Sequence, residues 1–415
     1  MLYATHLGLG TCWLAATLNR EAFTQEMHVR DNEWMPAISP IGYPAEKRSL
    51  QERMMRGTMK SSQRKPWKEL FFLTYFDTSF VYHDGKSEGA LRQAVVERHP
   101  RESFTIATKF PTFAVQTEDQ VEPVFAQQLS NLGTDYVDYY LLHILNTKLY
   151  NGVDGRGGVV KTCHLFDHVR EWKRQGKVRH MGFSFHDSPE LLDQILTENP
   201  DVEFVQIAIN YFDWNSYFIQ SKGCYDVICK HGKKIVVMEP VKGGCLAALP
   251  KASAQKLKAM DENASPASWA LRFAASQEGV LTVLSGMSNL AQMQENIKTM
   301  KDFAPLTGEE QNMLIKLADS QKESGPIGTA DFSAYEAASY HGISAAALLD
   351  SYNAAMVQPN PNFSVELNYL ANELLKIGVS DTAHVFPEES VIVNGEDVTA
   401  NVKEAWDFLI ARCFI

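Results

Sequence analysis

The feature that most constrains the fold is a regular alternation of two residue patterns that begins near Leu73. Short runs of β-branched and aromatic residues alternate with helical patterns of about ten to fifteen residues, which is typical of βα units around a parallel sheet. We predict strands over 73–77, 104–109, 137–142, 179–183, 203–208, 235–238 and 281–284. The helices are predicted near 87–98, 118–131, 162–174, 188–197, 217–231, 265–276 and 289–301. An eight-fold βα barrel needs one unit more than these, and the missing unit is the first.

The segments on either side of the alternation differ from it. Residues 1–72 are rich in loop signals, and although HLGLG at 6–10 could supply a first strand, no helix pattern follows it. After Phe303 we predict helices and one hairpin around Asn394-Gly395, over 307–320, 343–356, 365–377 and 389–398. The predicted fold class is therefore α/β, a (β/α)8 TIM-type barrel over 73–305 that lacks its first βα unit. It has an N-terminal loop-rich segment over 1–72 and a mainly helical C-terminal extension over 306–415.

The composition argues against several classes of function. The net charge of −11 leaves no basic footprint for nucleic acid or an anionic membrane surface. No apolar run reaches the roughly eighteen residues of a membrane span, and the N-terminus lacks the features of an export signal. The six scattered cysteines contain no C-x-x-C pair, which fits free thiols better than disulfides, a metal site or an iron–sulfur cluster. We expect a cytoplasmic protein without nucleic-acid, membrane, metal or cluster binding.

Four polar residues stand at or after the ends of three successive predicted strands: Asp77, Tyr82, Lys109 and His143. Each alone has an ordinary explanation, as a turn cap, a surface aromatic, a solvated strand end or a buried histidine. Together they fit the reduction of a carbonyl by a nicotinamide hydride, which needs a proton donor for the forming alkoxide. A tyrosine can donate that proton if its pKa falls from about 10, and a lysine held by an aspartate lowers it. A histidine can orient the substrate oxygen.

The stretch from Leu73 to Glu88, LTYFDTSFVYHDGKSE, resembles the Asp-Thr-Ala-x-x-Tyr segment of the aldo-keto reductases. The resemblance implies a catalytic tetrad of Asp77, Tyr82, Lys109 (in ATKFP) and His143 (in YYLLH). It also implies an NAD(P)H-dependent oxidoreductase that reduces a small-molecule carbonyl to an alcohol. The loops that would select the substrate carry no recognisable signature.

Later segments resemble the cofactor-binding loops of the same family. The resemblance implies that Ser184 and Gln206 contact the nicotinamide amide, that Tyr211 stacks on its ring, and that a glycine loop meets the pyrophosphate. The implied cofactor-binding residues are Ser184, Gln206, Tyr211, Pro240, Val241, Gly243, Gly244, Ser285, Gly286, Gln292, Glu295 and Asn296. The last helix begins with Asn289 and Gln292, where many NADP-specific members carry Arg or Lys. NADP(H) is the expectation from the family, and NAD(H) stays open.

Residues 1–72 resemble a different family. GLGTCW, IGYPAEKRSL and RKPWKELFF are similar to the last part of nitroreductase-family flavoproteins. That likeness implies that Arg64 and Lys65 stand where this family places the flavin phosphate. Most of the family's sheet and its first flavin-contacting cluster are missing from the sequence, so we do not expect FMN binding. The junction near Phe72 indicates a fusion of two truncated segments or an assembly error.

Three functional hypotheses follow from these patterns. The first is NAD(P)H-dependent carbonyl reduction. The second is a non-catalytic fusion product that keeps the tetrad on a barrel that cannot close. Its open sheet edge would invite aggregation or pairing with another copy, so a homo-oligomer is left open. The third is a flavin-dependent nitroreductase-like activity, which requires bound flavin. Dinucleotide binding by a cooperatively melting protein would distinguish the first from the other two.

Overall fold

The computed structural model describes residues 75–153, 157–301, 303–359, 366–379 and 384–413, and the backbone of two short strands near the N-terminus. These strands, β1 (Gly10–Thr11) and β2 (Ile41–Gly42), pair with each other antiparallel and not with the main sheet. Gly10 therefore does not extend the barrel as a first strand. The rest of residues 1–74 lies outside the described part, and with it Arg64, Lys65 and the nitroreductase-like motifs.

The main sheet contains seven parallel strands that pair in chain order. They are β3 (Tyr75–Asp77), β4 (Thr105–Phe110), β5 (Val137–Leu145), β6 (Val178–Phe185), β7 (Phe204–Ala208), β8 (Lys234–Met238) and β9 (Val280–Val283). The predicted strands are confirmed, with bounds that shift by a few residues. Within the described residues no strand covers the outer edges of β3 and β9, so the sheet is an open half-barrel. This is the geometry expected of a barrel that lacks one unit.

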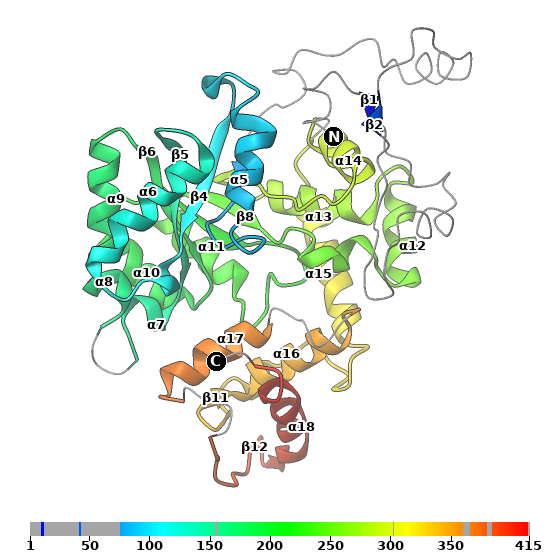
Figure 1. Cartoon of the computed structure of the whole chain (residues 1–415). Coiled ribbons are helices and arrows are strands. Elements are labelled where there is room, and N and C mark those ends of the chain that lie inside the picture. The colour runs from blue at the N-terminus through cyan, green and yellow to red at the C-terminus, as the bar shows by residue number, and fades with distance from the viewer. Residues whose placement is uncertain are drawn as a thin grey trace, which may run out of the picture.

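Helices follow the strands and cover the outer face of the sheet (Figure 1). They are α5 (Ser87–Leu91), α6 (Val121–Leu132), α9 (Leu165–Arg174), α10 (Pro189–Glu198), α11 (Ser221–Lys230), α13 (Pro266–Ala275) and α14 (Leu290–Lys301). The chain after α5 continues as a π-helical segment, η1 (Arg92–Val96). Helices α6, α9, α10, α11 and α13 bury apolar side chains, whereas no residue of α14 is buried. Trp172 of α9 stacks on Phe125 of α6, with 3.9 Å between the ring centroids.

Shorter elements lie in the connections. Three short helices were not predicted, α7 (Thr147–Tyr150), α8 (Val159–Thr162) and α12 (Lys251–Met260). Single 3₁₀ turns are η2 (Arg101–Ser103), η3 (Thr112–Ala114), η4 (Glu118–Gln120) and η6 (Ser333–Tyr335). The longer 3₁₀ segment η5 (Lys242–Ala247) is interrupted by a kink at Gly243 and Gly244.

The chain after the barrel splits between two cores. Helix α15 (Gly308–Lys322) starts at a capping box of Thr307 and Glu310, and its buried Leu314 and Leu317 lie in the barrel core. A second core combines Ala208, Phe218 and Ile219 of the barrel with side chains from Phe332 onward, which come from the last three helices and two hairpins. These are α16 (Ala345–Met356), α17 (Glu366–Lys376), α18 (Thr399–Ile410), β10 (Ser339–Tyr340) with β11 (Ile343–Ser344), and β12 (Ile392–Val393) with β13 (Glu396–Asp397). We call the described residues of 332–413 the C-terminal unit.

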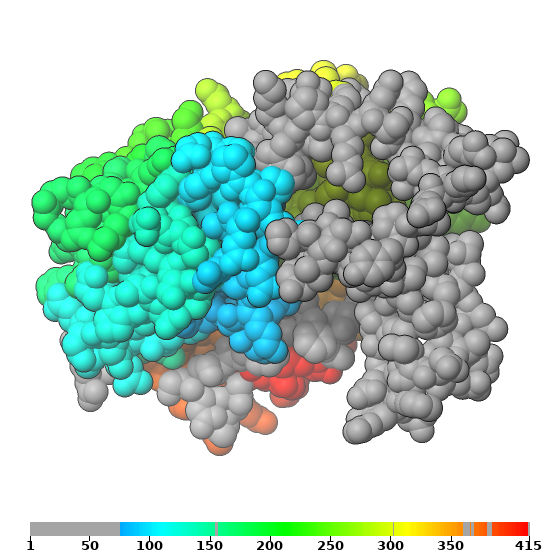
Figure 2. Space-filling view, turned by 45° about the horizontal axis from the view of Figure 1, so that its top comes forward, coloured from blue at the N-terminus to red at the C-terminus, as the bar shows by residue number. Residues whose placement is uncertain are grey.

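The C-terminal unit lies against the loops that leave the carboxyl ends of the strands (Figure 1). Asn372 of α17 donates a hydrogen bond of 2.6 Å to the carbonyl oxygen of His186, which follows β6. Lys376 pairs with Asp187 in the same loop at 2.6 Å. In Figure 2 the same unit emerges beneath the first βα units of the barrel, in orange and red. None of the helices in the described residues is long and apolar enough to cross a bilayer.

Candidate active site

The carboxyl edge of the first three strands of the sheet gathers the predicted tetrad. Asp77 ends β3, Lys109 lies near the end of β4, and His143 lies in the last part of β5. Because the strands are parallel and adjacent, their carboxyl ends share one edge, and the loop after β3 adds Tyr82 to it. The sheet thus brings together four residues that span 66 positions of sequence, from 77 to 143.

Lys109 is the centre of this group. Its side chain is fully buried, and its Nζ donates hydrogen bonds to Asp77 Oδ1 at 2.5 Å and to the carbonyl oxygen of Thr78 at 2.9 Å. Burial raises the pKa of Asp77, and the Lys109 ammonium opposes this rise. The second carboxylate oxygen of Asp77 is buried and has no hydrogen-bond partner within the described residues. A buried ammonium needs a counter-charge, and the ion pair with Asp77 holds Lys109 in place.

Tyr82 lies over Lys109 and faces the surface. The Lys109 Nζ is 4.9 Å from the centroid of the Tyr82 ring, and the Tyr82 residue is 37% exposed. The imidazole of His143 meets the Tyr82 ring edge-to-face, with 5.8 Å between centroids. The tyrosine is therefore the member of the tetrad that a ligand can reach, and it has a cation on one side and an imidazole on another.

The imidazole of His143 is kept in its neutral form. Burial lowers its pKa to about 3, and the nearby Lys109 and His186 contribute. Its Nδ1 is 3.3 Å from the hydroxyl oxygen of Ser79, and its ring lies 5.8 Å from that of Phe113, which is 48% exposed. Sequence reasoning missed Ser79 and Phe113. The position of Ser79 two residues after Asp77, on the loop that carries Tyr82, was the available signal for the first.

A buried polar network supports Lys109 from behind. Gln128 of α6 donates hydrogen bonds to the Lys109 carbonyl oxygen at 3.0 Å and to Glu88 Oε1 at 2.9 Å. Thr108 donates to the same Glu88 oxygen at 2.7 Å, and Glu88 is fully buried. Asn131 of α6 donates to the other Glu88 oxygen at 3.0 Å. Burial raises the pKa of Glu88, while its donors Thr108, Asn131 and Gln128 oppose that rise. The network ties β4 to α5 and α6, which limits movement of the strand end that presents Lys109.

Two of the predicted nicotinamide contacts are neighbours in the structure. Ser184 of β6 and Gln206 of β7 are register partners, and both side chains are buried. The hydroxyl of Ser184 accepts a hydrogen bond of 2.8 Å from the backbone N–H of Ile144. Gln206 Oε1 is buried without a partner in the described part of the chain. Tyr211 is 1% exposed and meets Phe273 edge-to-face at 6.0 Å, so its stacking role stays a prediction.

The remaining predicted cofactor residues lie in the loops after β8 and β9. Gly243 and Gly244 have φ angles of 61° and 98°, and a Cβ on either would meet no atom within 4 Å. Both are exposed, while Pro240 is buried and Val241 is half-buried. After β9, Asn296 donates a hydrogen bond of 2.8 Å to Ser285. The others in this group are exposed, namely Gly286, Gln292 and Glu295. Their cofactor contacts stay predictions.

A buried charge cluster beside this loop was not predicted. The Lys242 ammonium donates to Asp213 Oδ1 at 2.6 Å and to Glu366 Oε1 at 3.0 Å, and all three side chains are at most 3% exposed. Burial lowers the pKa of Lys242, but the two carboxylates raise it more, and the net shift is upward. Burial also raises the pKa of the neighbouring Glu239 to about 7. The cluster joins the loops after β7 and β8 to helix α17 of the C-terminal unit.

Comparison with known proteins decides the family. A sequence model of the aldo/keto reductase family matches residues 71–319, which is more than half of the chain. The chain belongs to the aldo/keto reductase family. The match covers the seven strands and all four tetrad residues. It begins at residue 71, so the nitroreductase-like interpretation of residues 1–72, and with it the fusion, has no support from this match and stays a prediction.

Individual relatives of this aldo/keto reductase are distant. An uncharacterized oxidoreductase YqkF of Bacillus subtilis is 22% identical over 256 residues, covering 54% of this chain and 77% of that protein. The aldo-keto reductase AKR11C1 from Bacillus halodurans, in its holo form, is 21% identical with a TM-score of 0.49, covering 60% of this chain and 84% of its own. An aldo-keto reductase from Klebsiella pneumoniae in complex with NADPH is 19% identical with a TM-score of 0.47, covering 65% and 87%.

Proposed function

We propose that this member of the family is an NAD(P)H-dependent reductase that converts the carbonyl group of a small molecule into an alcohol. The observation that carries the proposal is the contact of Tyr82 with a fully buried Lys109 that pairs with Asp77. An unpaired tyrosine hydroxyl is too weak an acid near neutral pH to protonate an alkoxide efficiently. The Lys109 ammonium lies close to the Tyr82 ring, where it can attract the negative charge that develops on the tyrosine during proton transfer.

Each tetrad residue then has one role in the proton transfer. The O–H bond of Tyr82 breaks as a new O–H bond forms on the substrate oxygen, and the electron pair stays on the phenolate. Lys109 stabilises that phenolate, and Asp77 holds the Lys109 ammonium in place through their ion pair. His143 is neutral at physiological pH, so it acts on the substrate oxygen by hydrogen bonding rather than by charge.

The residues at the carboxyl edge fit a nicotinamide dinucleotide. Gln206 Oε1 is a buried acceptor without a partner, and a carboxamide NH₂ is a donor that would satisfy it. Ser184 lies directly beside it, and the open space at Gly243 and Gly244 admits a close approach by a pyrophosphate. When bound, the dinucleotide would supply the hydride. We favour NADP(H), since a relative is known in complex with NADPH, and we keep NAD(H) as the alternative.

The open sheet favours one rival. No strand of the described residues pairs with the outer edges of β3 and β9, as expected of a fold that could not complete its barrel. A non-catalytic product of this kind would keep the tetrad without using it. Dinucleotide binding and carbonyl turnover distinguish the two hypotheses, because only the reductase requires them.

Thermal unfolding with NADPH and with NADH, followed by reduction of 4-nitrobenzaldehyde, tests the proposal. We expect one nucleotide to raise the melting temperature of the wild-type chain and of Tyr82→Phe alike. Tyr82→Phe should lower kcat by about 10²- to 10⁴-fold, because the proton donor is lost. Tyr136→Phe is a matched control: its ring stacks between Arg101 and Arg179, and it precedes β5 at the opposite edge of the sheet. If neither nucleotide shifts the melting temperature, the rival is correct.

A further inference from the structure

The imidazole of His143 carries one ring proton, and the position of that proton decides how the ring meets a substrate. The ring is neutral at physiological pH, because burial lowers its pKa to about 3. A neutral imidazole donates a hydrogen bond from one nitrogen and accepts one at the other. A carbonyl oxygen is an acceptor, so it is held by an N–H group and repelled by a bare nitrogen lone pair. The proposed reductase therefore needs the ring proton on the nitrogen that faces its substrate.

The two ring nitrogens of His143 have different surroundings. Nδ1 lies 3.3 Å from the hydroxyl oxygen of Ser79, which is fully buried. Nε2 has no hydrogen-bond partner among the residues that the structure describes. Two exposed aromatic residues, Tyr82 and Phe113, contact the imidazole. Nδ1 is thus held by the protein, and Nε2 is left for a ligand.

The hydroxyl proton of Ser79 gives this contact a direction. The Ser79 hydroxyl makes no other hydrogen bond within the described part of the chain. If Nδ1–H donated to Ser79, the hydroxyl proton would stay buried without an acceptor, which is destabilising and rare in native proteins. If the hydroxyl donates to Nδ1 instead, its proton is satisfied, and the proton of the neutral ring must lie on Nε2.

We propose that Ser79 is a positioning residue that donates its hydroxyl proton to Nδ1 of His143 and so keeps the ring proton on Nε2. There the N–H group can donate to a substrate carbonyl oxygen. This last step rests on the proposed function, whereas the location of the ring proton is a property of the free protein. The preceding residue, Thr78, accepts a hydrogen bond of 2.9 Å from Lys109 through its carbonyl oxygen. The loop after β3 therefore positions both the cation and the imidazole beside Tyr82.

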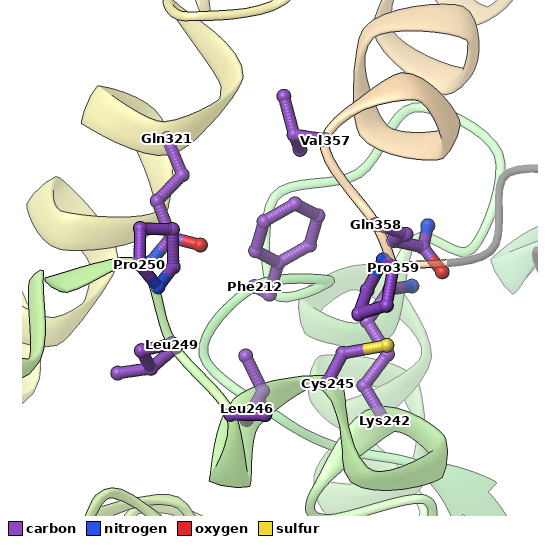
Figure 3. A pocket seen from close by; sticks show the side chains of 11 residues that line it. Phe212, Lys242, Cys245, Leu246, Leu249, Pro250, Gln321, Val357, Gln358 and Pro359 are labelled. Carbon is purple, nitrogen blue, oxygen red and sulfur yellow. The ribbon is translucent and has the colours of Figure 1, made fainter.

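A pocket between the barrel and the C-terminal unit is separate from this pair (Figure 3). It has a volume of about 260 Å³, and its walls include Phe212, Leu246 and Val357. Neither Ser79 nor His143 lines it. A carbonyl compound in this pocket would not contact the imidazole, so the pocket does not replace the tetrad edge as the place where His143 meets a substrate.

NMR of the full chain labelled with ¹⁵N-histidine tests the location of the ring proton, because protonated and bare ring nitrogens have well-separated ¹⁵N shifts. The chain has 12 histidines, and the signals that disappear in His143→Gln identify those of His143. At pH 7 without ligand we expect a protonated Nε2 and a bare Nδ1. Ser79→Ala should give a mixture of both forms, because neither nitrogen then has a fixed partner. Ser79→Thr keeps the hydroxyl and should restore the wild-type signals.

The reduction of 4-nitrobenzaldehyde gives a second readout. Ser79→Ala should lower kcat/KM about threefold to tenfold, the effect of one hydrogen bond. In a His143→Gln background the same substitution should cause no further loss, because Ser79 acts through His143. A serine with a merely structural role would lower kcat/KM equally in both backgrounds.

Ser276→Ala is the matched control. It removes a hydroxyl that makes hydrogen bonds with Arg272 and Leu306, and it lies before β9 at the opposite edge of the sheet from the tetrad. It should change neither the His143 signals nor kcat/KM.

Three results would overturn the proposal: a wild-type ring proton on Nδ1, unchanged His143 signals in Ser79→Ala, or equal losses of kcat/KM in the two backgrounds. The wild-type spectrum needs neither a variant of Ser79 nor turnover, so it decides even if Ser79→Ala does not fold or the chain reduces no carbonyl. A misplaced ring proton would leave the reductase function standing, since that function is tested by nucleotide binding and by Tyr82→Phe.

Discussion

The substitution Lys242→Met gives the strongest prediction for stability. In the native protein the Lys242 ammonium is the partner that pairs with both Asp213 and Glu366, and all three side chains are at most 3% exposed. Methionine keeps the length and apolar stem of the side chain but leaves two buried carboxylates with no cation between them. Breaking a buried ion pair from one side costs about 3–5 kcal/mol, and we expect a loss of unfolding free energy in that range.

Urea unfolding followed by circular dichroism measures this loss. In the wild type, the ammonium contributes to a lowered pKa of Glu366, so the carboxylate form is favoured on folding and that contribution is lost only in acid. In Lys242→Met the buried carboxylates favour protonation, so the defect should be smaller at pH 5 than at pH 8. Adding Asp213→Asn and Glu366→Gln should recover most of the loss. A change below about 1 kcal/mol, the value of a surface pair, would refute the argument that the cluster is buried and paired.

Three further predictions concern other positions. The pKa of His143 is lowered to about 3, so between that pH and about 6.5 the unfolded chain binds a proton that the folded protein does not. Stability should therefore fall as the pH drops through this window, by about 1.4 kcal/mol per pH unit, and His143→Phe should reduce this slope in urea titrations. Asn372→Leu removes hydrogen bonds to His186 and Asn146 and should lower the unfolding free energy by about 1–2 kcal/mol, while Asn312→Leu should not. Gly133→Ala should cost about 1 kcal/mol in the same assay, because φ is +64° and the new Cβ would meet the Arg92 side chain.

The order of the strands could be predicted from the sequence because it depends on local periodicity. Runs such as 137–142 and 203–208 are long enough to mark buried strands, and the helices between them fix a parallel arrangement. The tetrad could be predicted for the same reason. Asp77, Lys109 and His143 lie at or near the ends of successive strands, and parallel strands bring their ends to one edge.

Other features depended on contacts that no local pattern records. Lys242 and Glu366 are 124 positions apart, and each looks like an ordinary surface charge in its own segment. Helix α18 was missed although its Trp406 and Leu409 are buried, because its apolar face is defined only by the helices it packs against. Leu314 and Leu317 of α15 also belong to the barrel core, although they lie after the domain boundary predicted at residue 305.

The sequence by itself therefore determined the strand–helix alternation, the missing first unit and the residue types that end the strands. Those are properties of short segments, where spacing and side-chain chemistry are sufficient. The neutral state of His143 and the burial of Lys242 between two carboxylates became visible only in the tertiary structure. Protonation, pairing and desolvation depend on what packs around a group, and here the surrounding atoms come from distant parts of the chain.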